Sequence, residues 1–443
     1  MTVVAGVVVA CCVATIWGVA VAQAGQSLTT AAADGRVRIF YTAPILVRAG
    51  ERVLVAVDAV CATARGGPCP AVVTMHAGAG RRSYHTASAA ASPGLRFDLS
   101  AAAADAVSGR ATSGFVRFSI EANAGAARAS VPPDNGAPLL FYVARSVPAV
   151  KVPDVPFARE RRGRAVLSLP WGNGPNRAGI ALGGGDPPVG PSAFDVDGAG
   201  RVFLLDTEQS RLGVFSAGRL VRSTPLALAP RSDIALSPGG TAFVLARGAD
   251  GRVDLTRVSP GTAAQTVSAD AAGIPGAIRA VGGAAYVHVF PLDAWLPVAG
   301  TSATRAPEAP SVGRPLPGGR ELLSVVRGRR LRLGTVVGGR VRHAVELVFR
   351  RALGELALAA PDRAGGYWAV VHVWRDRPRP ADAFQAVHVR GRRVVSTFLL
   401  PSDGYTPDAP QSALRIGPNG GLYQLLTSAD GVRVVRYRIG GER

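Results

Sequence analysis

Apolar and polar residues alternate with a period of two in short runs along most of this chain. The runs at residues 52–57 and 115–120 show the pattern, and few segments carry the 3.6-residue period of a helix. The 443 residues include 54 glycines and 33 prolines, which favour frequent turns over long helices. The sequence therefore predicts an all-β protein, and its length predicts more than one domain.

The first predicted domain is a β-sandwich at residues 31–147. About seven strands in ~110 residues is the size of an immunoglobulin-like sandwich, although the Cys…Trp…Cys hallmark of that domain is absent. A short helical crossover is expected at residues 101–106. The next segment, 148–163, contains three prolines and a basic run and is predicted to be an extended linker. The strands predicted most clearly in the sandwich lie at residues 36–40, 52–57, 71–76, 95–99, 115–120 and 139–143.

A strand–turn–strand unit recurs over the rest of the chain, residues 164–443. Spacings of ~40–45 residues between most copies match a four-stranded propeller blade. Six copies predict a six-bladed β-propeller, and residues 165–169 are expected to close the ring as the outer strand of the last blade. The copies start near residues 194, 234, 278, 323, 356 and 414.

The best-defined copy points to a known repeat. Residues 194–198 (Phe-Asp-Val-Asp-Gly), followed by the runs 202–206 and 212–215, resemble an NHL-type propeller repeat. The resemblance implies a ligand-binding platform, an extracellular sensor domain of a bacterial kinase, or in some cases a metal-dependent lactonase or lyase. The fold alone does not choose among these functions.

The N-terminal segment predicts export. Residues 3–24 are apolar and uncharged, and Ala22-Gln23-Ala24 fits the small-x-small rule for cleavage before Gly25. The run is also about as long as the ~20 residues that span a bilayer. Residues 1–24 are therefore interpreted as a signal peptide or, alternatively, a membrane anchor. Either reading predicts a secreted or cell-surface protein.

Two cysteines, Cys61 and Cys69, flank a turn-rich stretch between strand-like runs. In an oxidising compartment we expect them to form a local disulfide, which would contribute about 2–3 kcal/mol. Two cysteines alone do not make a zinc site.

The charge of the chain bears on its partners. The formal net charge is +20, and Lys151 is the only lysine among 50 basic residues. A basic surface favours anionic partners, so we expect the unknown ligand to be an anionic cell-envelope polymer or another protein. Nucleic acid is disfavoured because aromatic residues make up only 6% of the chain. A membrane contact is expected only through the N-terminal segment.

Candidate binding residues lie near the start of the propeller. Asp195, Asp197 and Asp206 fall at calcium-loop positions 1, 3 and 12, but position 5 is Ala199, which has no side-chain oxygen. Turn-forming roles are therefore favoured for Asp197 and Asp206, with calcium as the alternative. Trp171 lies in a loop that enters the propeller and is expected to pack or to touch a ligand.

The sequence contains no recognisable catalytic residues, no metal-ligand set and no cofactor motif. Of its histidines, His288 and His372 are predicted on second strands of blades, away from the propeller axis. The predicted function is non-enzymatic binding or sensing on a propeller face. The alternative is a metal-dependent propeller hydrolase or lyase of the lactonase type.

Overall fold

The fold of the chain is nearly all β, as the alternating pattern predicts. The computed structural model describes residues 26–31, 37–61, 70–79, 84–132, 139–182, 188–247, 253–269, 274–290, 294–298, 311–362, 365–375, 380–401 and 411–437. The single helix among them, α1 (Ser100–Ala106), lies at the expected crossover. The segment 1–24 and Cys69 lie outside these residues, so export and the disulfide remain predictions.

The N-terminal part is a sandwich of two sheets. The first sheet contains, in spatial order, β1 (Gln26–Ala31), β2 (Val37–Ala43), β4 (Leu54–Cys61) and β7 (Leu95–Asp98). The second contains β3 (Leu46–Arg48), β10 (Leu139–Ala144), β8 (Ser113–Ala124), β5 (Val72–Gly78) and β6 (Tyr84–Ala90), with β9 (Ala127–Val131) paired to β8. All six strands predicted for this part are present.

Alternation along the sandwich strands creates the core between the two sheets. In β2, Val37, Ile39 and Tyr41 are buried, whereas Arg38 and Phe40 face outward. The buried residues pack against Phe118 and Phe141 from the second sheet. Period-two patterning thus specifies which face of each strand meets the other sheet.

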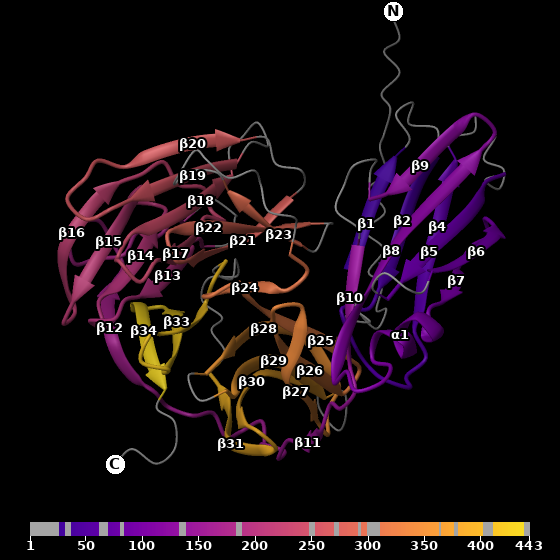
Figure 1. The fold of residues 1–443 in the computed structure, drawn as a ribbon. Helices are drawn as coiled ribbons and strands as arrows, with labels where there is room; N and C mark the ends of the chain where they lie inside the picture. Colours follow the sequence, from indigo (N-terminus) through magenta and orange to yellow (C-terminus); the bar gives the residue numbers. More distant parts are fainter. Residues whose placement is uncertain are drawn as a thin grey trace, which may run out of the picture.

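Six further sheets of the described chain form the blades of a propeller (Figure 1). The first three blades are β13 (Ala193–Val196), β14 (Val202–Asp206), β15 (Arg211–Ser216) and β16 (Arg219–Pro225); β17 (Asp233–Leu236), β18 (Ala242–Arg247), β19 (Val253–Val258) and β20 (Gln265–Ala269); and β21 (Ile274–Val281), β22 (Ala284–Phe290) and β23 (Ala294–Val298).

Two of the other three blades include a strand from a distant part of the chain. They are β24 (Arg314–Leu316), β25 (Arg320–Arg327), β26 (Arg330–Val337) and β27 (Arg340–Val348) with β11 (Ala149–Lys151); β28 (Leu353–Pro361), β29 (Tyr367–Arg375), β30 (Ala381–Arg390) and β31 (Arg393–Leu400); and β32 (Leu414–Ile416), β33 (Leu422–Ser428) and β34 (Gly431–Tyr437) with β12 (Arg164–Pro170).

The ring closes where the sequence pattern predicts. β12 lies antiparallel to β34, with Leu169 opposite Val432 and Pro170 opposite Gly431. Gly431 has φ +142, and a Cβ there would lie 2.0 Å from the carbonyl oxygen of Leu169. Only glycine therefore allows the two ends of the propeller to approach this closely.

Two predictions about organisation were wrong. The copy placed at Leu323 lies in β25, the second strand of its blade; the inner strand is the short β24, which contains only three residues and leaves little sequence pattern. The segment 148–163 is extended but is not a free linker. Val150 and Val152 are buried in the propeller because β11 pairs with β27, and Glu160 forms a bridge with Leu399 of β31.

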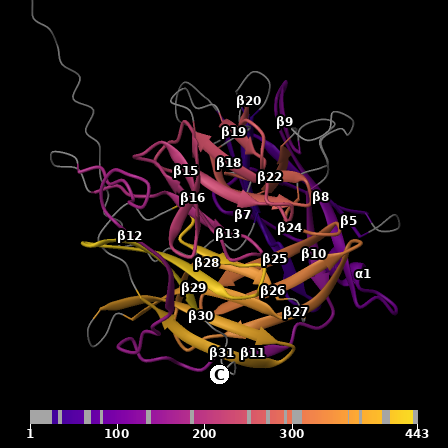
Figure 2. The same ribbon diagram turned by 90° about the vertical axis from the view of Figure 1, so that its left-hand side faces the viewer.

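The sandwich packs against the blade formed by β24–β27. Both views place β10 and β8 beside this blade (Figures 1 and 2). Leu46 and Tyr142 of the sandwich share an apolar cluster with Leu323 and Val336 of the blade. The two parts are therefore joined by a buried apolar contact as well as by the chain.

An ion-pair network reinforces this interface. Arg332 of β26 donates from its two Nη atoms to the carboxylate of Glu51, at 2.8 and 2.7 Å, and from Nη2 to Glu346 at 2.7 Å. The Arg332 side chain is only 9% exposed. These hydrogen bonds raise the pKa of Arg332 even though burial opposes its charge.

Candidate functional site

A cavity of about 800 Å³ lies on the propeller axis. Its walls come from the inner strands of all six blades, β13, β17, β21, β24, β28 and β32. The turns that join the first and second strands of the blades, such as residues 197–201 and 417–420, also line it. The cavity therefore opens on the face of the propeller that carries these turns.

Arg415 of β32 lies at the base of the cavity and ties three blades together. Its Nε donates to the carbonyl oxygen of Phe194 at 3.0 Å. Its Nη2 donates to Asp233 Oδ1 at 2.7 Å and to the carbonyl oxygen of Ile234 at 2.8 Å. Arg415 is 4% exposed and Asp233 is fully buried, so this pair serves the structure of the ring.

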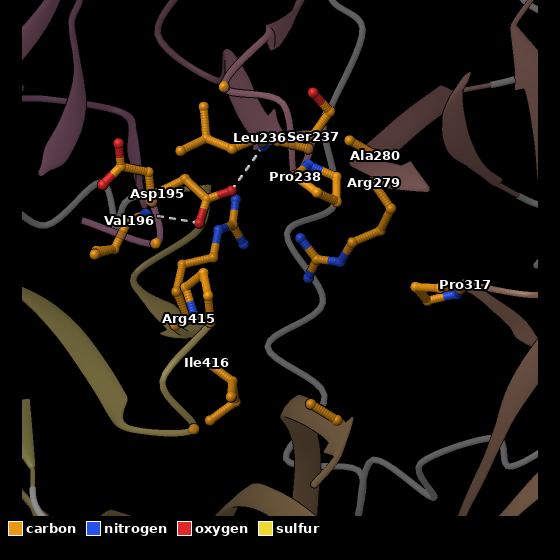
Figure 3. Close-up of a pocket in the computed structure, with 18 of the residues that line it drawn as sticks. Asp195, Val196, Leu236, Ser237, Pro238, Arg279, Ala280, Pro317, Arg415 and Ile416 are labelled. Carbon is orange, nitrogen blue, oxygen red and sulfur yellow. Dashed lines mark hydrogen bonds between the residues drawn. The ribbon is translucent and has the colours of Figure 1, made fainter. Parts of the chain in front are cut away.

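Two carboxylates beside Arg415, those of Asp195 and Asp233, each accept a hydrogen bond from the inner strand of the next blade. Asp195 of β13 accepts hydrogen bonds from its neighbour Val196 N and from Leu236 N of β17 (Figure 3). Asp233 of β17 accepts one from Ile278 N of β21 at 3.0 Å. Backbone donors of one blade thus orient acidic side chains of the previous blade.

The two aspartates differ in their pKa. Burial raises the pKa of Asp195, and Arg415 only partly opposes this effect. For Asp233 burial acts in the same direction, but Arg415 and Arg279 together outweigh it and hold the pKa below the ordinary value. Asp233 is therefore the better counter-charge within the site.

Two more arginines extend into the cavity, and neither forms an ion pair with a carboxylate in the part of the chain that the structure describes. Arg279 of β21 donates from Nη1 to its neighbour, the carbonyl oxygen of Ile278, at 3.1 Å, and Arg314 of β24 donates to the carbonyl oxygen of Ala359. The Nε of each is buried with no hydrogen-bond partner among the described residues. Figure 3 shows Arg279 reaching into the open space beside Arg415 and Asp195.

The electrostatics of these side chains favour a negative ligand. Burial, followed by repulsion from Arg415, lowers the pKa of Arg279 to about 10. Burial and repulsion from Arg279 and Arg415 lower the pKa of Arg314 as well. An anion in the cavity beside Arg279 and Arg314 would relieve this repulsion.

The candidate residues identified from the sequence do not form one site. Asp195 and Asp197 both line the cavity, and Asp197 accepts hydrogen bonds within its turn from Ala199 N and Arg201 N. Asp206 ends β14, ~13 Å further along the strand from the turn that holds Asp197. These aspartates therefore do not converge in the way that a calcium loop requires.

Asp206 and Trp171 have local structural contacts near the opposite face. The buried carboxylate of Asp206 accepts hydrogen bonds from Gly179 N at 3.1 Å and from Arg211 Nη2 at 3.2 Å. Burial raises its pKa against the influence of Arg211. The indole Nε1 of Trp171 donates to the carbonyl oxygen of Ser428 at 2.8 Å, and the ring packs against a core cluster.

The histidines are where the repeat places them. His288 lies on β22 and His372 on β29, both second strands. Across the described residues, no three His, Cys, Asp or Glu side chains gather as metal ligands. No helix in the described part of the chain is long and apolar enough to cross a membrane.

The arginines of the cavity were missed by sequence reasoning, although the sequence contains a signal for them. The position after the start of the repeat is charged in three of the six predicted copies, as Asp195, Arg279 and Arg415. Charged residues at one register of an otherwise apolar inner strand indicate that this register faces the axis. Arg314 could not be found in this way because its repeat was placed on the wrong strand.

Comparison with known proteins adds a likeness of fold. No protein-family model matches the chain, and no curated protein matches it. Among solved structures it is similar to a streptogramin B lyase, at 10% identity over 63% of this chain and 96% of that chain, with a TM-score of 0.33. It is also similar to virginiamycin B lyase of Staphylococcus aureus, at 7% identity over 56% and 95% of the two chains, with a TM-score of 0.34.

A third similar structure is an oxidoreductase of Thermus thermophilus named as a glucose dehydrogenase. It is 14% identical over 63% of this chain and 99% of that chain, with a TM-score of 0.32. At such identities and TM-scores, none of these likenesses assigns a ligand or a reaction to this chain.

Proposed function

We propose that this chain is an exported, non-enzymatic binding or sensing protein that holds an anionic group of its ligand in the axial cavity. The observation that carries the proposal is the pair Arg279 and Arg314, whose side chains line the cavity and form no ion pair with a carboxylate of the described residues. Guanidinium groups bind carboxylates and phosphates through parallel hydrogen bonds. The ligand is therefore a carboxylate, a phosphate or a similar anion.

The charge balance of the site supports this proposal. Three guanidinium groups, those of Arg279, Arg314 and Arg415, face two carboxylates, those of Asp195 and Asp233. Within this cluster, the described residues leave one guanidinium without a carboxylate, and burial makes charge pairing stronger than in water. Asp197, which pairs with Arg201, and Asp362, which pairs with Arg390, also line the cavity. A bound anion would complete the balance.

The sequence supports the location and the type of partner. The apolar run at residues 3–24 favours export, and the net charge of +20 favours an anionic partner from the cell envelope or an acidic region of another protein.

Titration with sodium phosphate and sodium acetate, at constant ionic strength, tests the proposal by calorimetry and thermal melting. We expect saturable binding at one site per chain and a rise in the melting temperature, because a ligand that binds only the folded state stabilises it. Arg279→Gln and Arg314→Gln should each lose this binding. Arg219→Gln, which changes an exposed arginine of β16, is the matched control and should retain it.

The proposal fails if neither these anions nor a longer carboxylate such as hexanoate binds the unmodified protein beyond the effect of chloride. It also fails if Arg279→Gln binds both anions as well as Arg219→Gln does.

A further inference from the structure

Apart from the charged cluster and the polar side chains of Asp197, Arg201, Ser237 and Asp362, the walls of the axial cavity are apolar. Leu236, Ala280, Leu316, Leu358 and Ile416 line it from five different blades. Its volume of about 800 Å³ is in the range of pockets that enclose a single small organic molecule. A bare inorganic ion would leave most of this apolar surface in contact with water.

Prolines occupy the mouth of the cavity. Four of the turns or strand ends at the mouth contribute one each, Pro238, Pro317, Pro361 and Pro418. A proline has no backbone N–H and its ring fixes φ, so these positions offer rigid apolar surface in place of donors. Figure 3 shows Pro238 and Pro317 on the same side of the cavity as Arg279, with Ile416 across from them.

This arrangement separates charge from apolar surface. Arg279 and Arg314 line the cavity from the inner strands β21 and β24, whereas the prolines lie at the turns or strand ends of its outer part. A polymer with an anionic group on every unit would have to place charges against the proline surface, where they would lose water without gaining partners. A single anionic group attached to an apolar body would match both regions.

We propose that the ligand is a small amphipathic organic acid. Its carboxylate or phosphate binds Arg279 and Arg314, and its alkyl or aromatic body lies between Leu236, Ile416 and the prolines of the mouth. This inference rests on the proposed function and narrows its ligand class. The envelope polymer suggested by the net charge becomes the competing outcome of the test.

The test is a calorimetric series with acetate, butanoate, hexanoate and octanoate on the full chain at fixed ionic strength. Burial of one methylene raises affinity by about fourfold, so hexanoate should bind up to about 200-fold more tightly than acetate. Long-chain polyphosphate is the second probe. Its affinity per chain should stay below that of hexanoate.

Ile416→Ala separates the apolar wall from the anion site. We expect this variant to lose several-fold in hexanoate affinity and to keep the acetate affinity of the unmodified protein. Val221→Ala, which shortens an exposed valine on β16, should change neither. The series on the unmodified protein does not depend on the folding of any variant.

The outcomes distinguish the two proposals. If phosphate and all four carboxylates fail to bind, the proposed function is wrong and this inference falls with it. If acetate, hexanoate and octanoate bind equally, or if polyphosphate binds more tightly than hexanoate, the anion site stands and the amphipathic ligand is overturned.

Discussion

Replacement of Leu169 by alanine should destabilise the whole propeller, because β12 closes the ring on β34. Leu169 is 3% exposed and packs in a cluster with Val432 and Val434 of the last blade and Phe194 of the first. The side chain thus contacts both ends of the propeller. Its loss weakens a junction that no covalent bond maintains.

The magnitude follows from the burial of the side chain. Replacing a buried leucine with alanine costs about 2–5 kcal/mol, which combines lost transfer free energy with the cavity that remains. In a domain of this size, each 1 kcal/mol lowers the melting temperature by about 2 °C, so we expect a decrease of about 4–10 °C. Ser168→Ala, at the exposed neighbouring position on the same strand, should change stability by less than about 0.5 kcal/mol.

Urea unfolding followed by circular dichroism measures both variants, and hydrogen exchange of residues 431–437 shows where the effect lies. We expect a single transition that moves to lower urea for Leu169→Ala, with faster exchange in β34. Equal midpoints for Leu169→Ala and Ser168→Ala would refute the reasoning, because the closing strand would then contribute nothing to the stability of the ring.

Two further predictions concern buried charge. Arg332→Met should lower the free energy of unfolding by about 3 kcal/mol, because it removes the buried guanidinium that joins Glu51 to Glu346 and leaves these carboxylates only their pairs with Arg48 and Arg330; a chemical denaturation midpoint unchanged from the unmodified protein would contradict this. Burial lowers the pKa of His388 from 6.5, despite its hydrogen bond to Asp362. Below about pH 6.5 the unfolded chain therefore binds more protons than the folded chain, so the free energy of unfolding should fall as the pH is lowered. His388→Gln should reduce the slope of the free energy of unfolding against pH. Identical slopes for the two proteins would contradict the role given to His388.

Much of the fold could be predicted because period-two patterning and turn chemistry act locally. The pattern of β2, with Val37, Ile39 and Tyr41 inward, needs no knowledge of the opposing sheet. Ring closure was predictable for a related reason. The run at residues 165–169 needs a partner strand, and the run at 432–437 pairs with β33 along one edge and needs a partner for the other. Ring closure pairs these two free edges.

The contacts between distant segments were not predictable in this way. The proline-rich stretch before β12 gives the pattern of a linker, yet Val150 and Val152 lie in the core of the propeller. Two isolated valines among prolines carry too little periodic signal to indicate a paired strand. The interface of Arg332 with Glu51 likewise joins residues that are 281 positions apart, and no local pattern links them.

The candidate site, like the fold, could be predicted from the sequence only in part. Asp195 and Asp197 could be selected because acidic residues stand out in an apolar repeat, but the repeat does not say which of them faces the axis. The structure places Asp195 beside Arg279 and Arg415, at one register of three inner strands. Comparing registers across repeats, rather than reading one repeat in isolation, would have brought these three residues together.

The stability of the ring and the geometry of the candidate site depend on the same bonds. Arg415 of the last blade donates to the carbonyl oxygen of Phe194 in the first blade and to Asp233 in the second. These hydrogen bonds cross the junction that β12 and β34 close, so an opened ring would also release Arg415 from Asp233. The charge balance around Arg279 would then change, because Asp233 and Arg415 both act on its pKa. Ring closure therefore fixes the positions of the charges that an anionic ligand would meet, and a variant that opens the ring should lose anion binding before it loses its individual blades.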